Sequence, residues 1–153
     1  MSVLYRHRQS ATAILLSLLL TAPVVLVVVV LSLQSPINLT AIAVVGGAVL
    51  ALLAGTGWYF SSMTIEVTDD ELRWRFGLGG YYRIARSEIE SVAPAKHSPF
   101  WGYGIRWIGP KRWAYIVSGR DAVDVRLRDG GYRRLGTNDR DELMKVLTST
   151  RRR

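Results

Sequence analysis

Side chains that could carry out chemistry are few in this chain, and they do not form a catalytic motif. Its 153 residues include no cysteine and two histidines, and only His97 lies outside the N-terminal segment. A lone histidine lacks the further ligands of a zinc site, so we interpret His97 as an exposed loop residue. Glu88 and Glu90 can share one face of a strand, but no nucleophile accompanies them, which favours a solvated sheet edge. We expect no enzyme, no metal and no cofactor.

The glycine-rich run at residues 77–80 invites comparison with a phosphate-binding loop. It lacks the GxxxxGK[ST] pattern and lies between two runs of alternating apolar residues. We interpret it as the turn of a hairpin.

Residues 94–113 interleave basic and aromatic side chains and contain no acid. Such surfaces suit the interface of an anionic lipid leaflet, where bases are attracted and rings prefer headgroup depth. The preferred interpretation of Trp101, Trp107 and Trp113 is that they fill a small barrel core, and an exposed surface is the alternative. A mixed outcome would expose Phe100 and Trp101 and bury the other two. The candidate surface for a membrane or a protein partner consists of Lys96, Phe100, Trp101, Tyr103, Arg106, Lys111 and Arg112.

The chain carries no ionisable side chain of Lys, Arg, His, Asp or Glu between Arg8 and Glu66. About 20 apolar helical residues cross a bilayer, so this run predicts two transmembrane helices, at about 11–33 and 39–60. Polar and helix-breaking residues at 34–38 mark the turn between them. Gly47, Ala51 and Gly55 form a small-residue stripe that predicts helix packing within this hairpin, with a homo-oligomer as the alternative.

Basic residues predict the orientation of these spans. Arg6 and Arg8 precede the first span and a basic region follows the second, in a chain of formal net charge +8. Because Lys and Arg favour the cytoplasmic side, we expect a multi-pass protein of the inner cell membrane with both termini cytoplasmic.

From residue 62 onward, apolar and polar residues alternate with the period of half-buried strands. Asp129-Gly130-Gly131 is a strong hairpin signal. Thr137 or Asn138 can cap a closing helix on which Leu143, Val146 and Leu147 recur at helical spacing. We predict four segments: an N-terminal cytoplasmic tail at 1–10, the two spans within 11–61, a β domain with a C-terminal helix at 62–150, and a basic tail at 151–153.

Three segments resemble the membrane-anchored bacterial pleckstrin-homology-like proteins, a largely uncharacterised family. They are residues 101–106 (WGYGIR), 115–119 (YIVSG) with Ala122 and Val123, and the closing 136–139 (GTND) with Glu142 and Leu143. The resemblance covers about 63–150. It implies a mainly antiparallel pleckstrin-homology-like barrel or sandwich with a C-terminal helix, in a membrane setting. It offers no catalytic motif.

These features together predict a non-enzymatic integral membrane protein whose cytoplasmic module scaffolds or recruits a protein partner, with peripheral contact to membrane lipids. One alternative is a module that binds or senses anionic lipid, and another is an accessory subunit of a larger membrane complex. A sequence pI near 10.3 is also typical of nucleic-acid-binding proteins, but the chain has no recognisable motif of that kind, and we expect no nucleic-acid partner.

Overall fold

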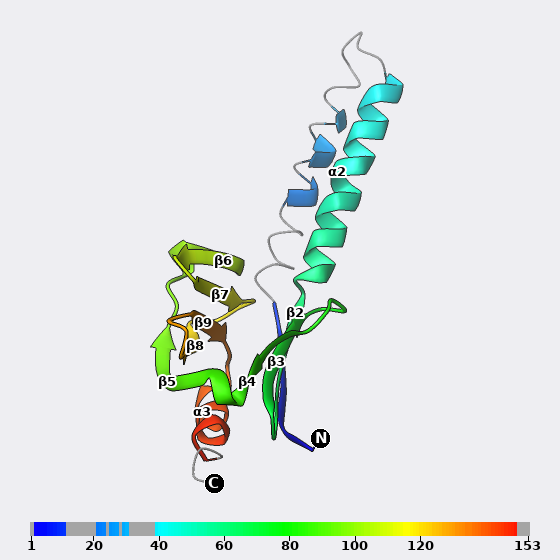
Figure 1. The fold of residues 1–153 in the computed structure, drawn as a ribbon. Helices are drawn as coiled ribbons and strands as arrows, with labels where there is room; N and C mark the ends of the chain where they lie inside the picture. Colours follow the sequence, from blue (N-terminus) through cyan, green and yellow to red (C-terminus); the bar gives the residue numbers. More distant parts are fainter. Residues whose placement is uncertain (1, 12–20, 24, 28, 31–38, 150–153) are drawn as a thin grey trace.

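The computed structural model describes residues 2–11, 21–23, 25–27, 29–30 and 39–149. Within them the chain forms a mainly β protein, with one long helix that projects away from the strands (Figure 1). The elements are β1 (Val3–Ser10), α2 (Leu39–Tyr59), β2 (Ser62–Thr68), β3 (Glu71–Phe76), β4 (Tyr82–Ala85), the 3-10 turn η1 (Arg86–Glu88), β5 (Ile89–Lys96), the 3-10 turn η2 (Pro99–Trp101), β6 (Gly104–Gly109), β7 (Arg112–Ile116), β8 (Asp121–Leu127), β9 (Tyr132–Gly136) and α3 (Arg140–Ser149).

The described strands form two sheets. The first is antiparallel, in the order β1-β2-β3-β4, and the second has the order β5-β8-β9-β7-β6. In the second sheet β7 and β9 run parallel, and the other neighbours are antiparallel. This parallel pair brings Arg112 of β7 opposite Tyr132 of β9, at the place where a pocket opens.

The N-terminal strand β1 completes the first sheet. Its residues pair with β2 in a register that sets Arg6 opposite Glu66 and Ser10 opposite Ser62. Just beyond the strand, the Ala11 N–H donates to the Ser61 carbonyl oxygen at 2.7 Å. The chain therefore leaves the sheet after Ala11 and returns to it at Ser61, at adjoining points.

Strands β2 and β3 supply much of the core. Leu72, Trp74 and Phe76 are buried along β3, whereas Arg73 and Arg75 alternate with them and are only half-buried, as the period-2 pattern predicts. On β2 every residue is buried, so both faces of this strand are covered. Glu66 is consequently buried, which its alternating pattern did not reveal.

Aromatic rings and a helix join the two sheets. Tyr115 of β7 lies with its ring centroid 5.0 Å from that of Trp74 and 5.1 Å from that of Tyr82, so β7 packs against β3 and β4. From α3, Leu143 and Leu147 are buried in the same core. The helix predicted at the end of the charged region is present, and the Thr137 hydroxyl accepts the N–H of Asp139 (3.1 Å) just before its first turn.

The Asp129-Gly130-Gly131 turn joins β8 to β9 as predicted. Gly130 has φ = 79°, a left-handed conformation that favours glycine. The Gly131 N–H donates to a carboxylate oxygen of Asp129 at 2.8 Å, which fixes the turn.

The predicted two-helix transmembrane hairpin is contradicted. In the part of the chain that the structure describes, we find no helix that combines the length and the apolarity needed to cross a membrane. Within the predicted span 11–33, the structure describes helix at residues 21–23, 25–27 and 29–30. The predicted turn at 34–38 lies outside the described residues.

The same finding contradicts the predicted localisation. Multi-pass insertion in the inner cell membrane rested on two spanning helices, which the described residues do not provide. The observed architecture is one antiparallel and one mixed sheet with the helices α2 and α3, rather than a transmembrane hairpin followed by a separate β domain.

Candidate binding surface

Large aromatic side chains are exposed around η2 and the β6–β7 hairpin. The exposed fraction is 99% for Phe100, 66% for Trp101, 65% for Trp107 and 37% for Trp113. Trp107 and Trp113 are direct cross-strand partners. We call these four residues the aromatic rim. The core-filling interpretation of the three tryptophans is wrong, because all three are exposed, and the mixed one is correct only for Phe100 and Trp101. The tryptophan that fills the core is Trp74.

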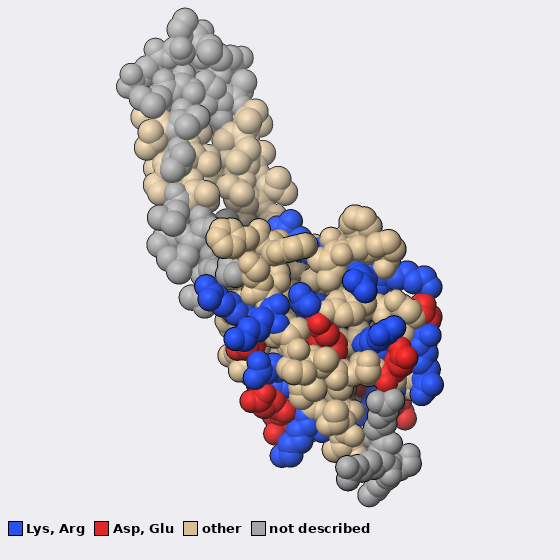
Figure 2. All heavy atoms as spheres, turned by 90° about the vertical axis from the view of Figure 1, so that its left-hand side faces the viewer, with Lys and Arg blue, Asp and Glu red and all other residues tan. Residues whose placement is uncertain are grey.

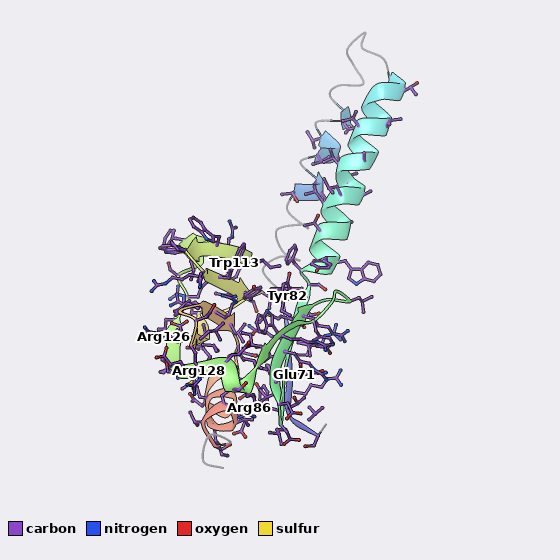
Figure 3. All side chains as sticks on the ribbon, in the orientation of Figure 1. Glu71, Tyr82, Arg86, Trp113, Arg126 and Arg128 are labelled. Atoms are coloured by element: carbon purple, nitrogen blue, oxygen red, sulfur yellow. The ribbon has the colours of Figure 1, made fainter. Side chains whose placement is uncertain are left out.

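The β6–β7 hairpin separates basic from aromatic side chains. Side chains alternate between the faces of a strand, so Trp107 and Trp113 point to the face opposite Arg106 and Arg112. Figure 3 shows Trp113 toward the upper end of the β region in this view, with Arg126 and Arg128 lower down. The hairpin thus has one aromatic face and one basic face.

A pocket of about 520 Å³ opens on the basic face. Its lining comes from the end of β5, from η2, and from β6, β7 and β9. The lining residues are Lys96, His97, Ser98, Trp101, Arg106, Ile108, Arg112, Ala114, Tyr132 and Arg134. Four of the predicted surface residues, Lys96, Trp101, Arg106 and Arg112, therefore meet at one site.

The other predicted surface residues lie outside this pocket. Phe100 projects into solvent, and Tyr103 is half-buried with its ring 6.0 Å from that of His97. Lys111, in the turn between β6 and β7, donates to the carbonyl oxygen of Asp129 at 3.1 Å and lies 3.6 Å from its carboxylate. The pKa of Asp129 lies below its ordinary value. The hydrogen bond from the Gly131 N–H is the largest cause, and the positive charge of Lys111 lowers the pKa further.

His97 is buried, at 6% exposure, rather than exposed as the sequence suggested. Its Nε2 lies 2.8 Å from the carbonyl oxygen of Gly102, and its backbone N–H donates to Arg120 O. These bonds hold the η2 loop against the second sheet, so the histidine has a structural role at the edge of the pocket.

Two residues of the pocket were missed by the sequence analysis. Arg134 donates to both carboxylate oxygens of Asp124, at 2.7 and 2.9 Å, and to the Tyr132 hydroxyl at 2.9 Å. Burial raises the pKa of Tyr132, and the Asp124 contact raises that of Arg134. Both belong to β9, whose place beside β7 follows from the parallel pairing and has no local sequence signal.

The predicted helix-packing residues lie on α2, away from the pocket. Among the described atoms, a Cβ placed on Gly47 or Gly55 would meet nothing within 4 Å, and Ala51 is exposed. A Cβ on Gly46 would instead lie 2.7 Å from Cγ2 of Val29. The close approach between the described helical segments is therefore at Gly46, one position from the predicted stripe.

Glu88 and Glu90 are exposed, and Glu90 pairs with Arg126 at 3.1 Å. Across the described residues, no group of three or more His, Cys, Asp or Glu side chains is arranged to hold a metal ion. No family model, curated protein or solved structure matches this chain, so the resemblance to pleckstrin-homology-like proteins stays a prediction.

Proposed function

We propose that this protein is a non-enzymatic binding module whose aromatic rim and adjacent basic face dock on an anionic lipid surface. The proposal concerns peripheral contact by the β region. The observation that carries it is the exposure of Phe100, Trp101 and Trp107 on η2 and β6, two of the elements that line a pocket rich in arginine and lysine.

Exposed rings favour transfer to a less polar surface. Each aromatic side chain buries about 150–250 Å² when fully covered, and that burial contributes on the order of a few kcal/mol. The rim places four such side chains on η2 and the β6–β7 hairpin, with Trp101 on the pocket side and Trp107 and Trp113 on the other face of the hairpin. Single exposed apolar residues, by contrast, need no explanation. A lipid interface accepts a projecting ring such as Phe100 without requiring a complementary pocket in a partner.

The basic side chains beside the aromatic rim also favour binding to an anionic lipid surface. Lysine and arginine side chains outnumber acidic ones on the face that Figure 2 shows. A basic residue close to an anionic leaflet contributes about 1 kcal/mol, and salt weakens this attraction. Rings and cations together suit the headgroup region, where both kinds of side chain find partners.

Flotation of the full chain with vesicles tests the proposal. Phosphatidylglycerol and phosphatidylcholine vesicles are compared at low and high salt, with the protein added from dilute nonionic detergent because of its long uncharged run. We expect a preference for the anionic vesicles that salt reduces. The variant Phe100→Ala/Trp101→Ala should lower the affinity for anionic vesicles by about tenfold or more, since it removes two rings.

The variant Val3→Ala/Leu4→Ala is the matched control, because it shortens two exposed apolar side chains on β1. It should bind as the wild type does. Equal binding by the rim variant and the wild type would contradict the proposal and direct attention to an acidic protein partner.

A further inference from the structure

We infer that the pocket bounded by Trp101, Arg106, Arg112 and Tyr132 is a binding site for a phosphate group. The inference deepens the proposed function, on which it rests for the lipid source of that phosphate. The same chemistry is presented by a lipid headgroup and by a free phosphate ester, and the experiment below separates these sources.

The charge around the pocket is unbalanced. None of its ten lining residues is acidic. Arg134 is neutralised by Asp124, but no carboxylate among the described residues lies within 4.0 Å of the side-chain nitrogens of Lys96, Arg106 or Arg112. Three cations that form no ion pair with a described carboxylate therefore border one hollow, an arrangement that attracts an anion.

Each of the two arginines has a contact within the protein that favours its position beside the pocket. The Cζ atom of Arg112 lies 5.4 Å from the centroid of the Tyr132 ring, which Arg134 also approaches at 5.8 Å. The Arg106 Nε donates to the Tyr103 carbonyl oxygen at 3.3 Å. Its guanidinium also occupies space that a side chain at position 102 would need, because a Cβ on Gly102 would lie 2.5 Å from Nη2.

Gly102 links this arrangement to the buried histidine. Its φ of 72° is a left-handed conformation, and its carbonyl oxygen contacts His97. The loop is thereby fixed where Arg106 can lie against it. Preorganised groups bind more tightly, because less rotamer entropy is lost on binding.

The donor set matches phosphate in particular. A guanidinium presents a planar fork of N–H donors that engages phosphate oxygens in pairs, and these charged hydrogen bonds are among the stronger ones. The pocket volume of about 520 Å³ exceeds what one phosphate needs. The remaining space beside Trp101 and Tyr132 can hold the organic part of a phosphate ester.

Titration of the 15N-labelled full chain in nonionic detergent tests the site. Glycerol 3-phosphate, inorganic phosphate and glycerol are added separately at constant ionic strength, and the indole N–H of Trp101 and the Nε–H groups of Arg106 and Arg112 are followed by NMR. We expect saturable shifts with both phosphates and none with glycerol. The variant Arg106→Gln/Arg112→Gln should weaken phosphate binding by about tenfold or more.

The variant Arg83→Gln/Lys145→Gln removes the same charge from exposed positions on β4 and α3, outside this pocket. It should leave the phosphate affinity within about twofold of the wild type, because the charge that it removes does not border the hollow. Equal weakening by both variants, or no saturable shift in the wild type, would overturn the inference.

The outcome is separable from that of the proposed function. Saturable binding of glycerol 3-phosphate without a preference for anionic vesicles would support the phosphate site and remove its lipid source. Vesicle binding that depends on Phe100 and Trp101 but not on the two arginines would support the lipid surface and overturn the phosphate site.

Discussion

At the scale of single residues, Glu66 concentrates several polar contacts on one buried side chain. Its carboxylate accepts from Arg73 at 2.7 Å and from the Tyr81 hydroxyl at 3.0 Å, and Arg6 lies 3.2 Å away. Removing one partner of a buried pair leaves an uncompensated charge. The residue therefore couples β1, β2 and β3 through one buried side chain.

We predict that Glu66→Ala lowers the free energy of unfolding by about 2–4 kcal/mol, because Arg73 loses its buried partner. Thermal or chemical unfolding followed by near-UV circular dichroism measures the change. Glu71→Ala is the matched control, because its contact with Arg73 is 3.5 Å long and more exposed, and it should cost less than about 1 kcal/mol. Similar losses for both variants would be inconsistent with the role given to Glu66.

Asp129 gives a prediction for pH dependence. Its folded pKa lies below its unfolded value of about 3.9, because the Gly131 N–H and Lys111 favour the carboxylate. The stabilisation is fully present above that unfolded value and is lost as the pH falls through the folded pKa. NMR titration of the Asp129 carboxyl should give a midpoint below about 3.9, and a midpoint above it would refute the assignment.

At the scale of elements, α3 covers the core through two leucines. Leu143 is fully buried, and Arg86 donates to the carbonyl oxygens of Val146 (3.1 Å) and Leu147 (3.5 Å) near the end of the helix. The packing of the leucines anchors α3 to the core that the two sheets share, and the hydrogen bonds from Arg86 anchor it to η1.

We predict that Leu143→Ala destabilises the protein by about 2–5 kcal/mol, because it creates a cavity in the shared core. Lys145→Ala, on the exposed face of the same helix, should stay within about 0.5 kcal/mol of the wild type. Urea unfolding of the two variants makes the comparison. A small effect at Leu143 would mean that α3 is not part of the cooperative core.

The elements that could be predicted were those with a local sequence pattern. The alternation of Leu72, Trp74 and Phe76, and the Asp129-Gly130 turn, were read correctly because period and turn chemistry are local. Strand β1 was missed, although Tyr5, His7 and Gln9 alternate with Leu4, Arg6 and Arg8, because its partner β2 lies more than 50 residues away in the sequence.

The pocket could be predicted only in part for the same reason. Lys96, Trp101, Arg106 and Arg112 fall within one basic and aromatic segment, so composition was enough to single them out. Tyr132 and Arg134 join them through the parallel pairing of β9 with β7, which no local pattern indicates. Composition also could not decide which tryptophans were exposed, since both core and surface use them.

At the scale of the whole molecule, residues 12–60 are an insertion between two paired strands. Ser10 pairs with Ser62, and Ala11 bonds to Ser61, so a two-residue turn could join these ends. A fragment that begins at Ser62 would lack β1 and expose the edge of β2.

We predict that replacing residues 12–60 by Asn-Gly leaves a folded β protein, because this dipeptide suits a two-residue hairpin. Some stability will be lost with Phe60, whose ring lies 5.4 Å from that of Phe76. Dispersed amide NMR signals would show folding. A collapsed spectrum for this variant, or an equally well-folded fragment that begins at residue 62, would contradict the role of β1.

The central claim is that the aromatic rim is the part of the molecule that meets anionic lipid. Because the chain has no cysteine, Phe100→Cys and Thr148→Cys each accept a single nitroxide label in the full chain, one on the rim and one on α3. Paramagnetic resonance then measures collisions of each label with oxygen and with a water-soluble nickel complex, with phosphatidylglycerol or phosphatidylcholine vesicles. The account predicts that phosphatidylglycerol increases oxygen contact and decreases nickel contact at position 100 while leaving position 148 unchanged. Equal responses at the two positions, or none at position 100, would contradict it.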